Sequence, residues 1–142
     1  MSKPLQKSLI VVIDDDEAAR TSLAQLLTLR RFDVRTFSSG EAALAWSDLP
    51  DCDVTVSDIK MPGMNGEELL AEVIRRRFMA PVILITGHGD VSMAVRCLKS
   101  GAYDFIEKPF DNEVILASVR RAVEKVSLSR EANELRRRLT LC

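Results

Sequence analysis

The chain lacks several features that mark other classes of protein. No apolar run among its 142 residues approaches the roughly 20 residues that a membrane helix needs. Residues 1–8 are polar and lack the apolar stretch of a signal peptide. A net charge of −1 leaves no overall field that would steer the protein to nucleic acid or to a membrane surface. Neither an internal repeat nor a low-complexity segment is present, so we expect a globular protein of the cytoplasm.

Cysteine and histidine are too few, and too poorly spaced, for a disulfide framework or a metal motif. The cysteines Cys52, Cys97 and Cys142 are odd in number and widely separated. A disulfide framework is also unexpected in a chain this apolar, so we predict three free thiols. His88 is the only histidine and has no neighbouring ligand in the sequence, which argues against a metal role for it.

What the chain does contain is a regular alternation of apolar segments. Hydrophobic residues make up 46% and charged residues 29%, enough apolar material for one domain with a real core. Short β-branched runs predict strands, and amphipathic stretches between and after them predict five helices. The strands are expected at residues 9–13, 34–37, 53–57, 82–85 and 102–106. This alternation predicts an α/β fold with one parallel sheet covered by helices on both faces.

Polar side chains stand where these apolar runs end. Asp14 and Asp15 follow the first run, Asp58 follows the third, Thr86 follows the fourth, and Lys108 follows the fifth. The carboxyl ends of parallel strands lie side by side, so residues far apart in sequence meet at one edge. Each residue alone has an ordinary explanation as a helix cap, a turn residue or a surface charge, and Asp16 is expected to be such a cap. Their joint placement favours a functional site.

The chemistry of this group suits a divalent cation and a phosphoryl group. Converging carboxylates repel one another unless a cation binds, and Mg²⁺ prefers carboxylate, phosphate and water oxygens. A carboxylate beside Mg²⁺ can act as the nucleophile toward phosphorus and become an aspartyl phosphate. An ammonium and a hydroxyl can then contact the phosphoryl oxygens.

Four motifs follow one another along residues 8–122. They are Ile13-Asp14-Asp15-Asp16, Ser57-Asp58-Ile59-Lys60-Met61-Pro62-Gly63-Met64, Thr86-Gly87-His88-Gly89-Asp90 and Lys108-Pro109-Phe110. Because all four occur in order, the chain resembles the receiver domain of two-component response regulators. The resemblance implies a CheY-like, doubly wound sheet of five parallel strands in the order 2-1-3-4-5 with five helices.

The resemblance implies a role for each residue of the acidic group. Asp58 becomes the phosphoacceptor and a Mg²⁺ ligand. Asp15 becomes a direct Mg²⁺ ligand, and Asp14 acts through a water. The backbone carbonyl of Lys60 completes the protein ligands.

It also implies how the phosphoryl group is sensed. Thr86 and Lys108 become the sensing pair, and Phe105 becomes the aromatic residue that follows Thr86. The bond between Lys108 and Pro109 is expected to be cis. Lys60 and His88, which flank the phosphoryl entrance, either tune the lifetime of the phosphorylated state or are ordinary exposed loop residues.

The leading interpretation is a phosphorylation-activated switch that receives its phosphoryl group from a sensor histidine kinase. It is not an enzyme for outside substrates, since it catalyses only its own phosphorylation and dephosphorylation. A Mg²⁺-dependent small-molecule phosphatase is an alternative, but such enzymes place an Asp where Lys60 stands. A pseudo-receiver that acts by contact alone is a third. Asn65 departs from the usual Asp of this family, yet Asn also suits a turn before Gly66.

The C-terminal residues extend the last helix beyond what a receiver needs. We expect residues 1–7 to be disordered, residues 8–124 to form the receiver domain, and residues 125–142 to form a helical linker to an absent output domain. An apolar residue recurs there at coiled-coil spacing, and this predicts a dimerising seam, with a frayed solvated helix as the alternative. The seam consists of Leu128, Ala132, Leu135, Leu139 and Cys142.

The same resemblance narrows the class of regulator. Segments around Thr86 and residues 101–106 are most similar to receivers of the NtrC/DctD class, including the C4-dicarboxylate transport regulators, and next to those of the FixJ class. The first class implies an AAA+ and DNA-binding output that acts on sigma-54 polymerase. Homodimerisation is expected through the fourth helix, fifth strand and fifth helix as well as the linker. No direct nucleic-acid binding is expected from this segment.

Overall fold

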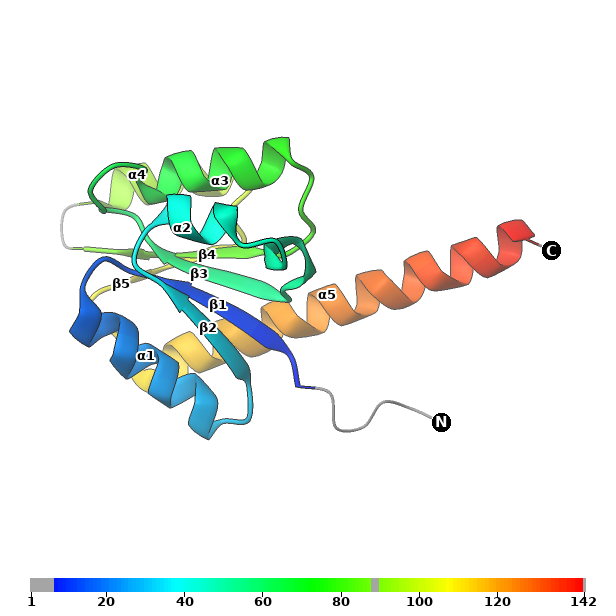
Figure 1. The fold of residues 1–142 in the computed structure, drawn as a ribbon, viewed down its shortest axis with the longest axis horizontal. Helices are drawn as coiled ribbons and strands as arrows, with labels where there is room; N and C mark the ends of the chain where they lie inside the picture. The colour runs from blue at the N-terminus through cyan, green and yellow to red at the C-terminus, as the bar shows by residue number, and fades with distance from the viewer. Residues whose placement is uncertain (1–6, 88–89, 142) are drawn as a thin grey trace.

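Five parallel strands form a single sheet in the order β2-β1-β3-β4-β5. The computed structural model describes residues 7–87 and 90–141. The order confirms the fold expected from the sequence, and Figure 1 shows the strands side by side between two layers of helices. The strands are β1 (Leu9–Ile13), β2 (Asp33–Phe37), β3 (Val54–Asp58), β4 (Val82–Thr86) and β5 (Asp104–Glu107).

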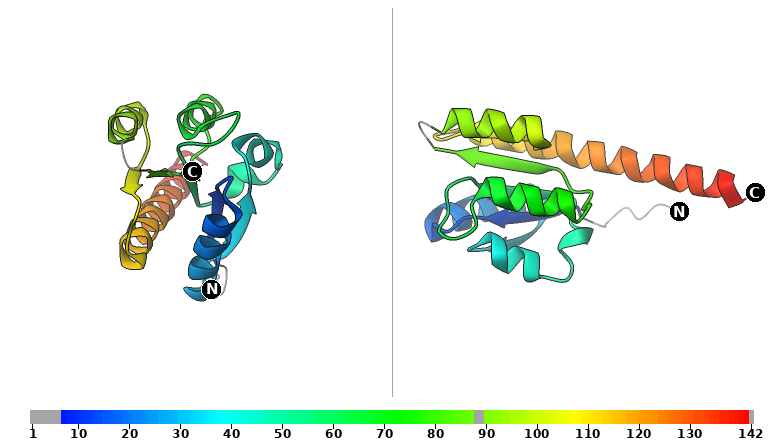
Figure 2. Two further views of the ribbon diagram at one scale, coloured as in Figure 1. Left: turned by 90° about the vertical axis from the view of Figure 1, so that its left-hand side faces the viewer. Right: turned by 90° about the horizontal axis from the view of Figure 1, so that it is seen from above.

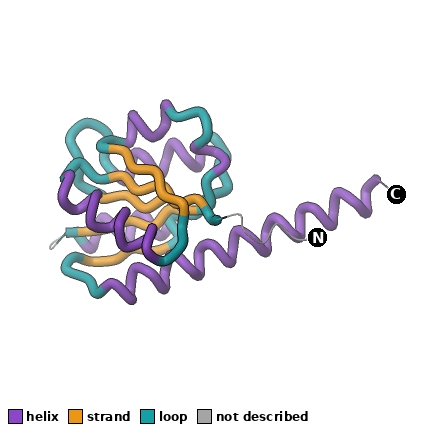
Figure 3. The backbone as a smooth tube through the Cα atoms, turned by 60° about the horizontal axis from the view of Figure 1, so that its bottom comes forward, coloured by secondary structure: helices purple, strands orange, loops and turns teal. Residues whose placement is uncertain are grey.

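The helices cover both faces of the sheet. One face carries α1 and α5, and the other carries α2, α3 and α4, as the two layers in Figures 2 and 3 show. A short 3-10 turn, η1 (Leu49–Asp51), precedes β3. The helices are α1 (Glu17–Leu29), α2 (Gly40–Ala45), α3 (Gly66–Arg75), α4 (Val91–Ser100) and α5 (Asn112–Leu141).

The central strands feed two separate cores, which explains their continuous apolar runs. Along β1, Ile10 and Val12 point to the side of α1 and α5, whereas Val11 and Ile13 point to the side of α2, α3 and α4. All four side chains are at most 1% exposed. A strand buried on both faces has no polar side to alternate with, as expected for a parallel sheet.

Short polar side chains begin three of the helices. Asp16 accepts a hydrogen bond from the Ala18 amide at 3.2 Å, which confirms its predicted role as a cap. Ser39 caps α2 in the same way. Asn65 and Glu68 form a reciprocal capping box at the start of α3. Asn65 therefore satisfies the backbone of this turn.

The last helix is one continuous element of 30 residues. It crosses residue 124 without a break and projects past the amino ends of the strands (Figure 1). Val126 is still buried, at 4% exposure, whereas Leu128, Leu135 and Leu139 are more than half exposed. Most of the segment predicted to be disordered, residues 1–6, lies outside the described residues. So does Cys142, for which we predict a free thiol.

Two of the three cysteines, Cys52 and Cys97, lie within the described residues. Both are buried free thiols. Burial raises the pKa of the Cys52 thiol to about 11. No helix in the described part of the chain combines the length and the apolar character needed to cross a membrane.

Candidate functional site

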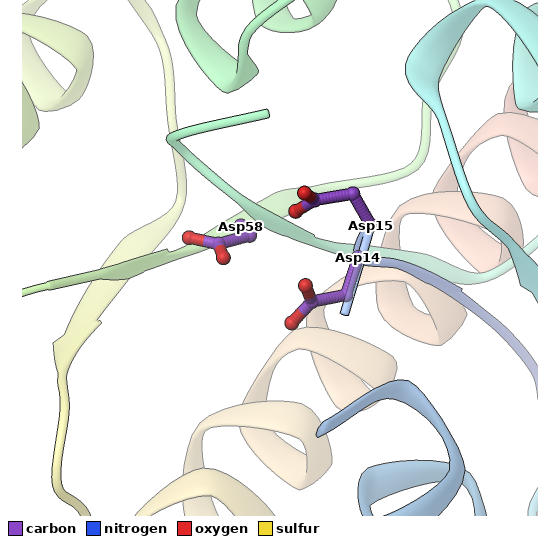
Figure 4. A group of neighbouring side chains, drawn as sticks. All are labelled: Asp14, Asp15 and Asp58. Carbon is purple, nitrogen blue, oxygen red and sulfur yellow. The ribbon is translucent and has the colours of Figure 1, made fainter. Parts of the chain in front are cut away.

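Three aspartates meet where β1 and β3 end. The carboxylate oxygens of Asp14, Asp15 and Asp58 that face one another all lie within 4.8 Å. Asp14 and Asp15 reach from the end of β1 toward Asp58 at the end of β3 (Figure 4). Asp14 is buried, Asp58 is half-buried and Asp15 is exposed. Exposure to solvent therefore increases from Asp14 through Asp58 to Asp15.

The topology of the sheet creates this meeting point. β1 and β3 are neighbours, with Ile13 opposite Ser57, so the residues that follow Ile13 lie beside Asp58. The chain turns to β2 on one side of β1 and to β4 on the other side of β3. The reversal of strand order leaves a crevice outside the carboxyl ends, where ligands of open α/β sheets bind.

Backbone contacts hold the loop after Asp58 close to the sheet. The Gly66 amide donates to the Ile59 carbonyl at 2.7 Å, and the Ile59 amide donates to the Ile85 carbonyl at 3.0 Å. A Cβ on Gly66 would lie 2.8 Å from the Asp58 carbonyl oxygen and from the Ile59 Cα. Glycine at this position lets α3 begin directly against the end of β3.

Asp14 is the aspartate of this group whose pKa is raised by its surroundings. Burial raises the pKa of the Asp14 carboxyl above its ordinary value, and the charge of Asp58 raises it further. The amide of Asp16 donates to the carboxylate at 3.0 Å and opposes the shift, as does the ammonium of Lys108. A second cation near these oxygens would relieve the excess negative charge.

Lys108 supplies the cation that the described structure places beside the aspartates. Its Nζ donates to Asp58 Oδ2 at 3.3 Å and lies 3.9 Å from Asp14 Oδ2. The Lys108 amide donates to the Thr86 carbonyl at 2.8 Å, which ties this loop to β4. The bond between Lys108 and Pro109 is cis, as the family resemblance implies.

Thr86 ends β4 beside the same crevice and is completely buried. Its Oγ1 is a buried side-chain oxygen with no hydrogen-bond partner within residues 7–87 and 90–141. Such an atom is rare, because a buried hydroxyl without a partner loses its hydration and gains nothing in return. The Thr86 hydroxyl is thus available to donate to a group that enters the site.

Phe105 stands on β5, next to the strand that carries Thr86. It lies opposite Leu84 in the register of β4 and β5, two positions before the pair of Thr86 and Glu107. Its ring is partly buried and packs against the core on the side of α2, α3 and α4. Phe105 is thus only partly enclosed by this core, on the strand beside the one that ends at Thr86.

Lys60 makes a contact that the sequence does not reveal. Its Nζ lies 3.1 Å from Asp90 Oδ1 at the start of α4. Asp90 occupies the N-cap position of α4, but its side chain makes no capping hydrogen bond to the helix. The contact spans two loops, and no local pattern signals it. His88, the other predicted tuning residue, lies outside the described residues.

The donor set suits a small hard cation. The group offers carboxylate oxygens from the ends of two strands, an exposed member in Asp15, and the buried Asp14 carboxyl, whose pKa is raised first by burial and then by the charge of Asp58. Mg²⁺ takes oxygen ligands and keeps several waters, and an open acidic cluster can accommodate both. Soft ligands are absent from it, since neither described cysteine belongs to the cluster.

Comparisons with known proteins agree with the fold and the site. Residues 10–120 match the response regulator receiver domain family. The chain is 44% identical over 132 residues to the transcriptional regulatory protein FixJ of Rhizobium meliloti (strain 1021), covering 90% of this chain and 65% of FixJ. It is 43% identical over 128 residues to the C4-dicarboxylate transport transcriptional regulatory protein DctD of the same organism, covering 90% of this chain and 28% of DctD.

A solved structure of a related protein has the same fold as this chain. The crystal structure of FixJ-N superposes with a TM-score of 0.77 at 46% identity, covering 84% of this chain and 95% of that one. Both classes of regulator expected from the sequence are thus among its relatives, at nearly equal identity. The chain spans less than two thirds of the length of these curated relatives. Taken with the sheet order and the acidic cluster, these matches show that the chain belongs to the receiver domain family of two-component response regulators.

Proposed function

We propose that Asp58 accepts a phosphoryl group from the phosphohistidine of a sensor kinase and that the chain works as a reversible signalling switch. Receiver domains interact with histidine kinases and are linked to output domains, and they are not enzymes in the usual sense. The observation that supports this most strongly is the cluster of Asp14, Asp15 and Asp58 with Lys108 at 3.3 Å from Asp58. A cytoplasmic location fits this role.

The proposed reaction is a displacement at phosphorus. A carboxylate oxygen of Asp58 forms a bond to phosphorus, the bond between phosphorus and the kinase histidine nitrogen breaks, and that nitrogen keeps the electron pair. Asp15, Asp58, the backbone carbonyl of Lys60 and, through a water, Asp14 would hold Mg²⁺. When bound, this ion neutralises charge on the phosphoryl oxygens.

Two further side chains respond to the charge that Asp58 acquires. The Lys108 ammonium pairs with one phosphoryl oxygen, and the unpartnered hydroxyl of Thr86 donates to another. Movement of Thr86 toward the phosphoryl group leaves space into which Phe105 turns. The surface formed by α4, β5 and α5 then changes shape.

The output of the switch is a change in how two copies of the chain associate. We propose contact through α4, β5 and α5 together with the seam on the last helix. Leu128, Leu135 and Leu139 support the seam, since each is more than half exposed. The covalently linked output in the full protein would be an AAA+ and DNA-binding module that acts with sigma-54 polymerase, or a FixJ-type output, and this segment itself would not touch DNA.

Among the residues that the structure describes, none at the site favours a phosphatase for small molecules. Such an enzyme needs a general acid two residues after its nucleophile. That position holds Lys60, whose ammonium is engaged by Asp90 at 3.1 Å. The site also retains the full set of groups that a pseudo-receiver would lack.

Phosphorylation of Asp58 can be tested directly with acetyl phosphate as the donor. Phos-tag electrophoresis should show a shifted band for the wild-type chain in the presence of Mg²⁺ and none after chelation with EDTA. Asp58→Asn should abolish the shift, because the amide is a poor nucleophile. Asp51→Asn, which removes a carboxylate from η1, serves as the matched control and should behave as the wild type. A shifted band that persists in Asp58→Asn would refute the assignment.

A further inference from the structure

Asp53 joins the last helix to the amino-terminal edge of the sheet. It directly precedes β3, and its Oδ2 accepts a hydrogen bond from the Leu9 amide at 2.7 Å. Its Oδ1 pairs with Nη1 of Arg130, which lies 77 residues further along the chain. The Asp53 side chain is 15% exposed and that of Arg130 is 47% exposed. One largely buried carboxylate thus contacts both the first strand and the fifth helix.

Packing next to this pair holds the same part of the helix. Val126, one turn before Arg130, is only 4% exposed and is therefore covered by the domain body. The ammonium of Lys125 lies 5.3 Å from the centroid of the Tyr103 ring, within reach of a cation–π contact. Contact between the helix and the domain body therefore extends to Arg130.

Beyond Arg130 the helix is supported only by itself, as far as the structure describes it. The ion pairs of Arg137 and Arg138 go to Glu134 on the same helix. The side chains of Leu135 and Leu139 are 58% and 69% exposed. Asp53 is consequently the last point of the domain body to which an ion pair ties the helix.

The pair lies on the side of the helix opposite the exposed leucines. An α-helix turns by about 100° per residue, so Leu128 and Leu135 lie on one side of the helix. Val126 and Arg130 lie on the opposite side, two residues before and after Leu128. Anchoring Val126 and Arg130 on the domain therefore directs the leucines away from it.

We propose that the pair of Asp53 and Arg130 is a conformational latch that fixes the rotation of the projecting helix relative to the receiver domain. With the latch closed, the leucines face outward and are presented to a second copy of the chain. This consequence rests on the proposed function, whereas the latch itself does not. Release of Arg130 would free the helix after Val126 to turn or bend, and the seam would lose its fixed direction.

Amide hydrogen exchange of residues 127–135 tests the latch. Asp53→Asn keeps an oxygen for the Leu9 amide but removes the charge, and Arg130→Gln keeps helix propensity but removes the cation. Each should speed exchange in this segment about threefold, the effect of losing one partly exposed ion pair. The double variant should exchange no faster than either single variant, because both remove the same contact. Arg137→Gln, whose partner lies on the same helix, is the matched control.

Two further conditions separate the latch from dimerisation. The measurements are repeated with Leu135→Glu and Leu139→Glu in the same chain, where a second copy cannot protect the helix. The Asp53→Asn effect should persist there, and raising NaCl to about 1 M should speed exchange in the chain that retains Asp53 but not in Asp53→Asn. Unchanged exchange in Asp53→Asn, or an effect that vanishes in the glutamate background, would overturn the latch. Both outcomes are independent of whether Asp58 is phosphorylated.

Discussion

At the scale of single residues, the Thr86 hydroxyl has an unfavourable effect on the stability of the unmodified domain. It is buried beside the acidic cluster and has no partner in the described structure. A buried hydroxyl in this condition lowers the stability of the unmodified domain, and the entry of a phosphoryl oxygen would remove that penalty. The unmodified state is thus less stable than the same fold would be with an apolar side chain here.

Replacing Thr86 by a residue of the same shape measures this penalty. Thr86→Val should raise the free energy of unfolding of the unmodified chain by about 1 kcal/mol, because no unpaired hydroxyl remains. Urea denaturation followed by circular dichroism gives the value. Thr55→Val is the matched control, since Thr55 on β3 is also buried but its Oγ1 lies 3.4 Å from Cys52 Sγ. A loss of stability in Thr86→Val equal to that in Thr55→Val would contradict the prediction.

Asp14 should make the stability of the metal-free chain depend on pH. Burial is the main reason why the pKa of Asp14 in the folded chain lies above its ordinary value of 3.8. At a pH between the ordinary pKa and the raised pKa, the folded chain therefore binds more protons than the unfolded chain. Stability from this group therefore falls as pH rises through that window. In EDTA, Asp14→Asn should be more stable than the wild type near neutral pH, with a gain that shrinks below pH 3.8. Asp15→Asn, at an exposed position, should gain less in the same urea series.

The positions of the site residues are the part that sequence reasoning predicts well. Asp14, Asp58 and Thr86 follow or end apolar runs, and the rule that parallel strands end at one edge brings them together. The unpaired state of the Thr86 hydroxyl and the contact between Lys60 and Asp90 were not predictable. Both depend on side-chain directions that three-dimensional packing decides.

At the scale of elements, Gly66 sets how closely α3 can approach β3, the strand that ends at Asp58. A Cβ there would meet backbone atoms of Asp58 and Ile59 at 2.8 Å, and backbone cannot move aside cheaply. Gly66→Ala should lower the free energy of unfolding by about 2 kcal/mol and displace the loop after Asp58. Urea denaturation measures the first effect, and the rate of phosphorylation by acetyl phosphate measures the second. In Gly87→Ala the nearest atom is 3.5 Å away, so a loss as large in that control would count against the steric explanation.

The elements themselves follow from local pattern, whereas their ends do not. The strand predicted at residues 53–57 is Val54–Asp58, so Asp58 itself is the last residue of the strand. The strand predicted at residues 102–106 begins only at Asp104. A strand ends where its backbone partners end, and those partners lie in distant parts of the chain. The β-propensity of the sequence therefore predicts where a strand lies, but not the residue at which its hydrogen bonding begins or ends.

At the scale of the whole molecule, the exposed leucines predict self-association through the last helix. Leu135→Glu should weaken the dimer by about tenfold or more, because it removes an apolar contact and places like charges at the seam. Sedimentation equilibrium of the wild type and the variant, with and without acetyl phosphate, gives the change. Glu131→Gln on the same exposed stretch is the control and should leave association nearly unchanged. Equal dissociation constants for the wild type and Leu135→Glu would exclude the seam as an interface.

The sequence predicts that the last helix continues beyond the receiver domain. It does not predict which residues join that helix to the rest of the domain. Spacing alone identifies Leu128, Leu135 and Leu139 as one stripe, since the pattern lies within a single helix. The contact of Arg130 with Asp53 crosses 77 residues and leaves no periodic trace. Long-range ion pairs of this kind become visible only when the coordinates are known.

The last helix begins after the carboxyl end of β5 and extends past the amino ends of the strands, so it has the geometry of a lever arm. Its 30 residues span about 45 Å at 1.5 Å per residue, and the stretch after Arg130 makes up about 16 Å of this. A tilt of about 10° at Arg130 would move the tip by about 3 Å, half the pitch of an α-helix. A small change of angle where the helix leaves the domain would thereby become, at its tip, a displacement of the size at which one helix changes register against another.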